Sequence, residues 1–374
     1  MTTLTLAAVD LSDLRTTLAG ASLPRALGSL LGLAAGDALG TTHEFKALTA
    51  PPFPTLATGP LIDIVGEGPF RLAPGEVTDD TQMAAGLADV FAREGRLDAA
   101  AIAARYLAWR EVAFDIGVQI SQVLQRIEAG GDATGEGRRL WDEKQRHPAG
   151  NGSLMRTAVI GVMLAGHPDL RHATFLDGAV THFDPRCQLA CAAFNASIAH
   201  ALTGRPSPAS MVRAAADELP AAAADLRGRH PDLRAEIDGA EAALRADLAA
   251  ARDDDPDLYG DELHLHRAAG FVRVAFRLAY WELLHAPDYA AAVIDAANRG
   301  GDADTNAAIT GALWGAFAGV DGLPPAWIAR VLAAPGLASG GWEFHPRVFL
   351  GALARGFGAD RPELAPYLAA ARRG

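Results

Sequence analysis

The segment TDDTQMAAGLADVFAREG, residues 78–95, combines an apolar helical repeat with two adjacent carboxylates at its start. Its apolar side chains recur at the spacing that places them on one face of a helix: Met83, Leu87, Val90 and Phe91. Such a stripe must be buried, because its side chains would otherwise remain in water. The segment therefore predicts an amphipathic helix whose N-cap is Thr78 or Asp79.

The same helical period recurs in residues 98–111, 117–130 and 307–318, and alternating strand patterns are nearly absent. Residues 61–65 have strand-forming side chains, but Pro60 and the glycines that follow favour a loop. Helices of this kind bury their apolar stripes against one another, so the sequence predicts an all-α protein.

Two further stretches have no helical period of their own. Residues 47–75 are rich in proline and glycine, and a long irregular loop of this kind in a compact protein is often functional. The run Asp253-Asp254-Asp255-Pro256-Asp257 is interpreted as a solvated turn, because its proline and lack of ordered partners favour exposure.

The composition is that of a globular protein with an acidic surface. A formal net charge of -12 argues against nucleic acid or an anionic membrane as a standing partner, because their phosphates would be repelled.

The chain has two cysteines, Cys187 and Cys191. Their spacing is neither that of a disulfide framework nor that of a metal site, and they are interpreted as buried apolar residues. The start of the chain does not resemble a signal peptide, and the longest uncharged stretch, residues 305–320, is too short to span a bilayer. We therefore expect a cytoplasmic protein.

Two acidic clusters are the strongest candidates for chemistry: Thr78-Asp79-Asp80-Thr81 and, after two glycines, Asp302-Ala303-Asp304-Thr305. One interpretation is that each simply caps a helix. However, two neighbouring carboxylates exceed what a cap needs and resist ionising together without a compensating cation. Mg²⁺ or Mn²⁺ favours carboxylate and hydroxyl oxygens, whereas zinc would favour His or Cys. Asp302 and Asp304 are expected to aim at one point from a non-helical segment before residues 307–318.

Other polar positions have both a structural and a functional interpretation. Gly36–Gly40 ends an apolar helix expected over residues 26–35, where glycines favour a C-cap and close packing, and Glu44 follows. Asp115, before Ile116-Gly117, is an N-cap candidate.

Residues 150–156 form a glycine-rich turn before a helix, so Asn151 or Ser153 can cap it, or its backbone N–H groups can hold phosphate or ribose oxygens. In residues 181–185, Asp184 is expected to cap a helix with Pro185 in its first turn, and His182 is structural or catalytic.

Taken together, these motifs resemble the ADP-ribosylglycohydrolase family, which includes dinitrogen-reductase-activating glycohydrolases and ADP-ribosyl-acceptor hydrolases. The resemblance implies one compact, orthogonal helical bundle over residues 1–374, with a core at about residues 24–320 and a binuclear metal cleft. It also implies two divalent cations, Mg²⁺ or Mn²⁺, bound by Thr78, Asp79, Asp80, Asp302, Asp304 and Thr305. The ADP-ribose site would be lined by Gly150, Asn151, Gly152 and Ser153, with His182 close by.

The implied activity is hydrolysis of the glycosidic bond between ADP-ribose and an acceptor, either a modified protein or a small conjugate. Glu44 and Asp115 would be the catalytic acids, and Glu44, which follows a rigid helix end, is favoured for proton transfer. The acceptor remains open between arginine, serine, O-acetyl-ADP-ribose and a nucleic acid base, in that order of preference. Alternatives are a non-catalytic ADP-ribose-binding or structural protein on the same fold, and a Mg²⁺-dependent phosphatase, whose Asp-x-Asp-Thr run should follow a buried strand.

Two departures from the family pattern stand out. Val118-Gln119 follows Gly117 where small or hydroxylated residues are expected, and this affects the role of Asp115. Residues 206–261 look longer and more acidic than expected, as a variable helical region or an insertion.

Overall fold

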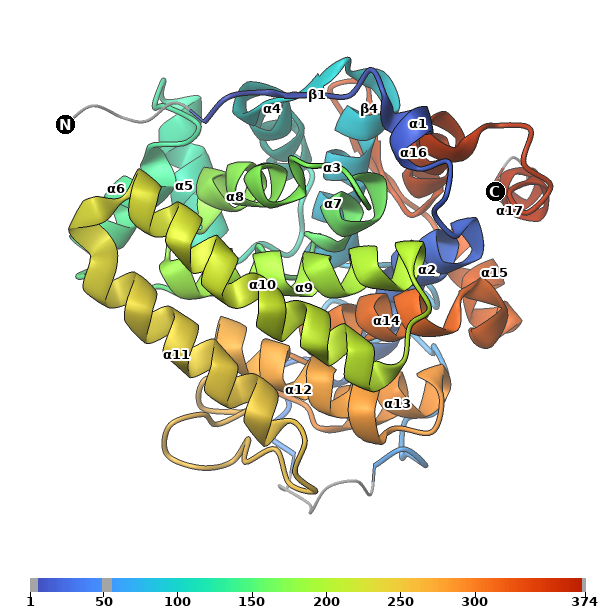
Figure 1. Ribbon diagram of the computed structural model, residues 1–374. Coiled ribbons are helices and arrows are strands. Elements are labelled where there is room, and N and C mark those ends of the chain that lie inside the picture. The colour runs from blue at the N-terminus through green and yellow to red at the C-terminus, as the bar shows by residue number, and fades with distance from the viewer. Residues whose placement is uncertain (1–5, 49–55, 372–374) are drawn as a thin grey trace.

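The computed structural model describes residues 6–48 and 56–371, which form 17 α-helices and four short strands (Figure 1). Up to residue 203 the helices are α1 (Leu14–Thr17), α2 (Leu23–Gly40), α3 (Asp79–Arg93), α4 (Ala99–Arg110), α5 (Val118–Glu128), α6 (Glu136–Glu143), α7 (Ala158–Met163), α8 (Leu170–Thr181) and α9 (Pro185–Thr203). The remaining helices are α10 (Pro208–Arg229), α11 (Arg234–Ala250), α12 (Val272–His285), α13 (Tyr289–Asn298), α14 (Ala303–Ala318), α15 (Pro325–Ala333), α16 (Arg347–Phe357) and α17 (Ala365–Ala371).

The strands make two small antiparallel pairs and no larger sheet in the described residues, so the all-α prediction is confirmed. The pairs are β1 (Val9–Asp10) with β2 (Arg96–Leu97), and β3 (Leu337–Ser339) with β4 (Trp342–Phe344). Residues 61–65 form a loop as expected. Of the irregular segment 47–75, residues 47–48 and 56–75 contain no helix or strand, and residues 49–55 lie outside the described residues.

The core is built around α2 and α14, which contact each other along most of their lengths. Both helices are buried on every face from residues 26 to 40 and from 303 to 316, which is why neither shows a polar stripe. Figure 1 shows α14 in the middle of the bundle, where it packs on α9, α12 and α13.

Four glycines at every fourth position of α2 face α14. A methyl group at any of them would lie only 2.1–2.5 Å from a carbonyl oxygen of α14: Gly28, Gly32, Gly36 and Gly40. The two backbones can approach this closely only because no Cβ separates them. The expected close packing is confirmed, but the expected helix end at residue 35 with a glycine C-cap is wrong, since α2 continues through Gly40.

The start of α14 also differs from the prediction. This helix begins at Ala303, so Asp304 and Thr305 lie in its first turn, and only Asp302 has a non-helical backbone. The helices expected over residues 98–111 and 117–130 are confirmed as α4 and α5. Cys187 and Cys191 are buried in α9, as expected.

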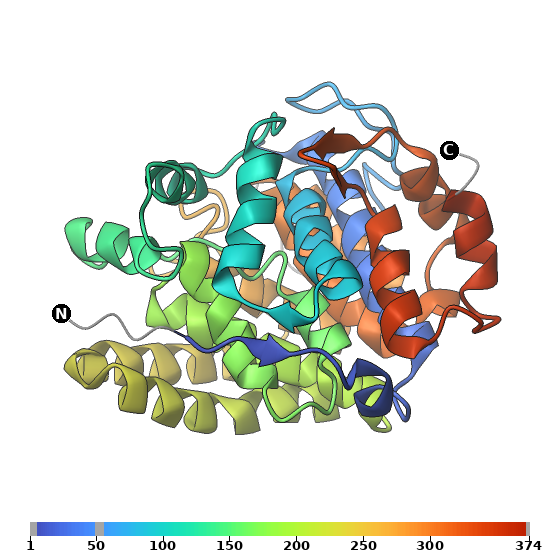
Figure 2. The ribbon, with the colours of Figure 1, turned by 90° about the horizontal axis from the view of Figure 1, so that it is seen from above.

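The variable region forms the antiparallel pair α10 and α11, and both helices pack on α9. Seen from above (Figure 2), this pair forms one outer edge of the bundle, and α15 to α17 lie on the other side. The four aspartates between residues 253 and 257 are exposed in a turn that follows α11, as predicted, whereas Pro256 is buried. No helix among the described residues has both the length and the apolar character that a bilayer span requires.

We predict that Gly36→Ala lowers the free energy of unfolding by about 2 kcal/mol or more, because the new methyl group would lie 2.1 Å from the carbonyl oxygen of Ala307. Urea unfolding followed by circular dichroism measures this change. The matched control is Gly239→Ala in α11, where nothing lies within 4 Å of the added Cβ. That variant should be stabilised by about 0.5–1 kcal/mol, because alanine is the better helix former. Equal effects at the two glycines would contradict the close contact.

Candidate functional site

The two acidic clusters meet at the N-terminal ends of α3 and α14. The Thr305 hydroxyl lies 3.3 Å from Oδ2 of Asp80 and donates a hydrogen bond to it. One carboxylate oxygen each of Asp37, Asp80 and Asp304 lies within 4.8 Å of the others, and the same holds for Glu44, Asp302 and Asp304. The structure therefore brings the two clusters together and joins them to the end of α2.

Asp37 holds the start of α3 in place. Its Oδ1 accepts hydrogen bonds from the Thr78 backbone N–H at 3.0 Å and the Thr78 hydroxyl at 2.8 Å. Its Oδ2 accepts from the Thr81 N–H at 3.1 Å and the Thr81 hydroxyl at 2.5 Å. The sequence patterns did not place Asp37 in the acidic site. A lone carboxylate inside an otherwise apolar helix was the available signal.

The interpretation of both clusters as simple helix caps is wrong. Thr78 and Asp302 occupy the N-cap positions of α3 and α14, but neither side chain accepts a capping hydrogen bond. The Thr78 hydroxyl lies within reach of Asp37 and, at 3.1 Å, of Asp80. The acids still benefit from the positive end of each helix dipole. The N–H of Thr81 in the first turn of α3 is instead bonded by Asp37, a residue of another helix.

Glu44 lies just after the 3-10 turn Thr41–His43 that follows α2, and its side chain hydrogen-bonds to Asp304. Burial raises the pKa of Glu44 far above its usual range, and the nearby charges of Asp304 and Asp302 raise it further. The Glu44 Oε2 atom is buried without a hydrogen-bond partner. A buried carboxylate with a free oxygen needs a proton or a cation for compensation.

Asp115 lies between α4 and α5 and hydrogen-bonds to Asp79. Its interpretation as an N-cap is wrong, because Gly117 is the N-cap of α5. Burial raises the pKa of Asp115 to about 6, and the charges of Asp302 and Asp37 act in the same direction. Asp115 therefore joins the cluster from a third element of the fold.

The electrostatics of the whole cluster are unfavourable without a counter-charge. Burial and neighbouring carboxylates raise the pKa of Asp79 and of Asp80 well above the usual range. Burial also raises the pKa of Asp304 to about 8, although its hydrogen bond with Glu44 opposes this shift. Asp80 Oδ1 is a second buried oxygen without a partner. Proteins keep such groups charged by pairing them or by binding metals.

The donor set fits hard divalent cations. Oxygens bound to one Mg²⁺ at about 2.1 Å lie at most about 4.2 Å apart. The oxygens of each carboxylate set lie within 4.8 Å of one another, so at most small side-chain movements would bring them to one ion. The two sets share Asp304, which can bridge two neighbouring sites. The buried carboxylates could therefore hold metal ions, while Asp79 belongs to neither set.

The glycine-rich turn at residues 150–156 borders the cluster. The Asn151 side-chain amide donates a 2.7 Å hydrogen bond to Asp302, and its backbone N–H donates to the carbonyl of Gly270 at 2.9 Å. The turn does not run directly into a helix, because α7 begins at Ala158 with Thr157 as its N-cap. Capping of this helix by Asn151 or Ser153 is therefore wrong, whereas the binding of phosphate or ribose oxygens by the N–H groups of this turn stays a prediction.

A buried arginine fixes the shape of this turn. Arg156 Nη1 donates to the Gly152 carbonyl at 2.8 Å, and its Nε lies 3.1 Å from Oδ2 of Asp177. Ser153 is fully buried, and its hydroxyl lies 3.5 Å from the Cys191 thiol. Ser153 is not among the side chains that line the cleft, in contrast to Gly150, Asn151 and Gly152.

His182 lies against the turn. Its Nδ1 is 2.8 Å from the Thr181 hydroxyl, and a Cβ at Gly152 would lie 2.8 Å from the ring. Burial and the charge of Arg156 lower the pKa of His182 well below its usual range, so the ring is neutral. Asp184 caps α9 and Pro185 lies in its first turn, as predicted.

A cleft of about 440 Å³ opens onto the acidic cluster, and Glu44, Asp79, Asp115 and Asp302 are among its lining residues. The predicted site residues did not include nine residues of this lining: Phe45, Ile116, Gly117, Val118, Gln119, Ile120, Met155, Ala269 and Gly270. Gln119 also donates to the Thr181 carbonyl at 3.1 Å, which gives the unexpected residue after Val118 a structural role.

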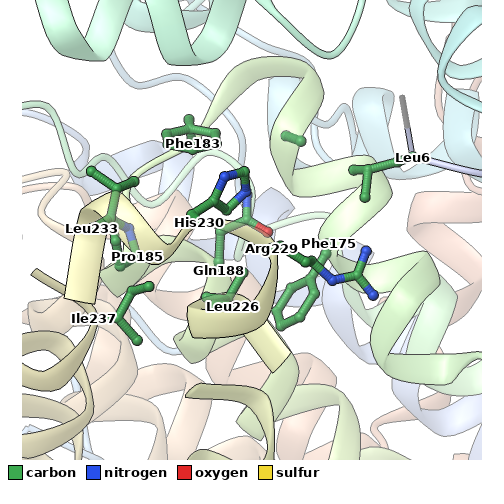
Figure 3. Close-up of a pocket in the computed structure, with 11 residues that line it drawn as sticks. Leu6, Phe175, Phe183, Pro185, Gln188, Leu226, Arg229, His230, Leu233 and Ile237 are labelled. Carbon is green, nitrogen blue, oxygen red and sulfur yellow. The ribbon is translucent and has the colours of Figure 1, made fainter. Parts of the chain in front are cut away.

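A second, apolar cavity lies between α8, α9 and the α10–α11 pair (Figure 3). Phe175, Phe183, Leu226, Leu233 and Ile237 are among the residues that line it, and no carboxylate does. Its free space of about 20 Å³ is room for roughly one water molecule. The acidic cleft is therefore the candidate site for chemistry.

Known proteins are similar to this chain in sequence and in fold. Residues 20–354 match the family model described as ADP-ribosylglycohydrolase. The chain therefore belongs to the ADP-ribosylglycohydrolase family.

Two relatives and one solved structure show how similar this chain is to known proteins. It is 30% identical over 312 residues to the ADP-ribosyl-(dinitrogen reductase) glycohydrolase of Rhodospirillum rubrum, across 82% of this chain and 90% of the relative. It is 31% identical over 325 residues to the ADP-ribosylarginine hydrolase Tri1 of Pseudomonas putida (strain GB-1), across 83% and 75%. A solved structure described as an ADP-ribosylglycohydrolase-related protein complex matches with a TM-score of 0.64 at 27% identity, across 89% and 98%.

We predict that Mn²⁺ or Mg²⁺ raises the thermal unfolding midpoint of the protein and that Asp80→Asn abolishes this rise. A ligand at about 100 times its Kd stabilises the folded state by about 2.7 kcal/mol per site. The metal-free variant should be at least as stable as the metal-free wild type, because a neutral amide replaces a buried carboxyl group whose ionisation is unfavourable, and the amide oxygen can still accept from Thr305. Thermal shift with and without EDTA measures both effects. Asp255→Asn in the exposed turn is the control and should behave like the wild type. Unchanged metal stabilisation in the Asp80 variant would exclude Asp80 as a ligand.

Proposed function

We propose that this protein is a metal-dependent hydrolase that cleaves the glycosidic bond between ADP-ribose and an arginine side chain of a modified protein. The observation that carries the proposal is the meeting of the two acidic clusters in one buried site with unpartnered carboxylate oxygens. Two relatives support the choice of substrate. One is named for dinitrogen reductase and the other for ADP-ribosylarginine.

In this proposal two divalent cations, Mg²⁺ or Mn²⁺, are held by residues of both clusters and of α2. The ligands would come from Thr78, Asp79, Asp80, Asp302, Asp304 and Thr305, with Asp37 as an addition suggested by its place beside Asp80 and Asp304. When bound, such cations can orient substrate oxygens and lower the pKa of a water molecule. The clusters supply only oxygen ligands, which agrees with these two metals and not with zinc.

The chain's own residues would orient the sugar and move the proton. Glu44 and Asp115 reach the cluster from two separate segments, through Asp304 and Asp79 respectively. Cleavage of a glycosidic bond develops positive charge on the sugar, which nearby carboxylates stabilise. Glu44 is our choice for proton transfer, because it follows the rigid end of α2 and its buried Oε2 atom has no hydrogen-bond partner within the protein.

ADP-ribose would lie along the turn at residues 150–152, with His182 beside it. The neutral ring of His182 can exchange hydrogen bonds without adding charge. Asn151 would position both the ligand and Asp302, to which it donates a hydrogen bond. Ser153, predicted as a substrate contact, would instead support the turn from behind.

The alternatives differ in what they require of the structure. A phosphatase of the Asp-x-Asp-Thr type needs a buried strand directly before Asp302, but α13 and a glycine turn precede it here. A non-catalytic ADP-ribose-binding protein on the same fold would bind the ligand and release nothing, so measured hydrolysis decides between it and the enzyme.

We predict that Asp302→Ala reduces the release of ADP-ribose from ADP-ribosyl-arginine by at least about 100-fold, because the loss of a metal ligand removes several kcal/mol of transition-state stabilisation. Chromatography of the products with Mn²⁺ or Mg²⁺ measures the rate, and circular dichroism checks that the helical fold remains. A panel of arginine, serine, O-acetyl and nucleic acid conjugates identifies the acceptor. Full activity of the Asp302 variant would overturn the metal site, whereas a wild type that cleaves only another conjugate would overturn the acceptor alone.

We further predict that Glu44→Gln lowers kcat by about 100- to 10,000-fold, the usual range for the loss of a general acid or base. The affinity for free ADP-ribose, measured by isothermal titration calorimetry, should change only a few-fold. Asp115→Asn is the matched variant. If Asp115→Asn loses kcat and Glu44→Gln does not, proton transfer belongs to Asp115.

A further inference from the structure

Three phenylalanines form an exposed aromatic cluster at the mouth of the acidic cleft. The Phe45 and Phe70 ring centroids are 6.2 Å apart and nearly perpendicular, and those of Phe70 and Phe114 are 5.4 Å apart. Phe45 is 67% exposed and Phe114 is 41% exposed, which is unusual for rings that could be buried. We call Phe45, Phe70 and Phe114 the aromatic cluster.

The aromatic cluster is joined to both candidate catalytic acids. Phe45 directly follows Glu44, and Phe114 directly precedes Asp115. Phe70, from the irregular segment before α3, contacts the rings of both. Phe45 borders the cleft, together with Ile116 and Val118, which is 74% exposed. The apolar surface therefore continues from the acids to the outside of the molecule.

The backbone holds Phe45 in a costly conformation. Its φ angle is +59°, in the left-handed region that side chains other than glycine, asparagine and aspartate rarely adopt. Its N–H donates to the Gly301 carbonyl at 2.8 Å, and the Gly301 N–H donates to the Lys46 carbonyl at 2.9 Å. The glycine loop before Asp302 thus fixes an exposed ring at the cleft mouth. Strain of this kind, kept by surrounding hydrogen bonds, is typical of ligand-binding positions.

The charge at this mouth favours a cation. Seven carboxyl groups form the acidic site, so a cationic group beside it meets hydrogen-bond acceptors and not like charges: Asp37, Glu44, Asp79, Asp80, Asp115, Asp302 and Asp304. The nearby cations Lys46 and Arg71 are exposed to solvent. A planar cationic group can stack on an aromatic face and remain close to the carboxylates, which a neutral, non-planar group cannot do.

The remaining walls of the cleft suit the nucleotide. The turn at residues 150–152 reaches the carboxylates through Asp302, and the segment of Phe45 reaches them through Asp304. If ADP-ribose lies along the turn at residues 150–152, the acceptor lies on the opposite side of the carboxylates, at the segment of Phe45. We infer that the aromatic cluster binds the guanidinium group of the ADP-ribosylated arginine by stacking, and so selects arginine acceptors. This inference rests on the proposed function.

The test compares Phe45→Leu with Phe45→Tyr in the metal-loaded protein. Leucine keeps apolar bulk but has no aromatic face, whereas tyrosine keeps the face. We expect Phe45→Leu to raise KM for an ADP-ribosyl-arginine peptide by about tenfold, the typical effect of a cation–π contact, while kcat changes less than twofold. Phe45→Tyr should restore the wild-type KM. The dissociation constant of free ADP-ribose, which has no guanidinium group, should remain within twofold in both variants.

The control is Ile62→Ala, which removes another exposed apolar side chain of the same irregular segment, 59% exposed and not part of the cleft lining. It should leave every constant unchanged. Equal KM values for the Phe45→Leu variant and the wild type would overturn the inference. An equally weakened binding of free ADP-ribose would also overturn it, and would assign the aromatic cluster to the adenine. A wild type without activity on the arginine peptide would overturn the proposed acceptor itself, so the two failures are distinct.

Discussion

The close contact between α2 and α14 is the constraint on which the rest of the structure depends. The glycines of α2 face the backbone of α14, and a Cβ at Gly36 would overlap the carbonyl of Ala307. The same approach places Asp37 beside Asp304, because the two residues extend from facing helices. Asp37 in turn fixes the start of α3 through its hydrogen bonds to Thr78. Because glycines of α2 face α14, the two helices approach closely, and this approach brings the acids together at one end of the helix pair.

This arrangement also explains the unfavourable electrostatics of the site. Close-packed helices bury their first-turn acids, and burial disfavours the charged form of each. The pKa of Asp304 is raised to about 8 and that of Asp115 to about 6, while Asp80 and Glu44 keep oxygens without partners. An apolar core would remove these costs, so their presence indicates a purpose other than stability. The helix dipoles at both N-termini lower the cost only in part.

The sequence predicted the fold class and the meeting of the acids, since both follow from local patterns and the family resemblance. It did not predict the continuation of α2 through Gly40, because a helical glycine is favourable only when a partner backbone lies against it. The burial of Ser153 was missed because it also depends on a long-range contact. Arg156 fixes the shape of the turn that contains Ser153, and the partner of Arg156 is Asp177, which is distant in sequence. The contacts of Phe70 depend on an irregular segment, for which no periodic pattern exists.

The loop before α14 connects the rigid and the irregular parts of the site. Gly300 and Gly301 both have left-handed φ angles, and a Cβ at Gly300 would lie 2.2 Å from the carbonyl of Lys46. This loop therefore sets the position of Asp302 on one side and the backbone of Phe45 on the other. A change in the cleft mouth cannot be made at these glycines without moving a candidate metal ligand. The shape of the cleft mouth can instead be varied through side chains, such as those of Phe45, Phe70 and Phe114, while the backbone of the loop stays in place.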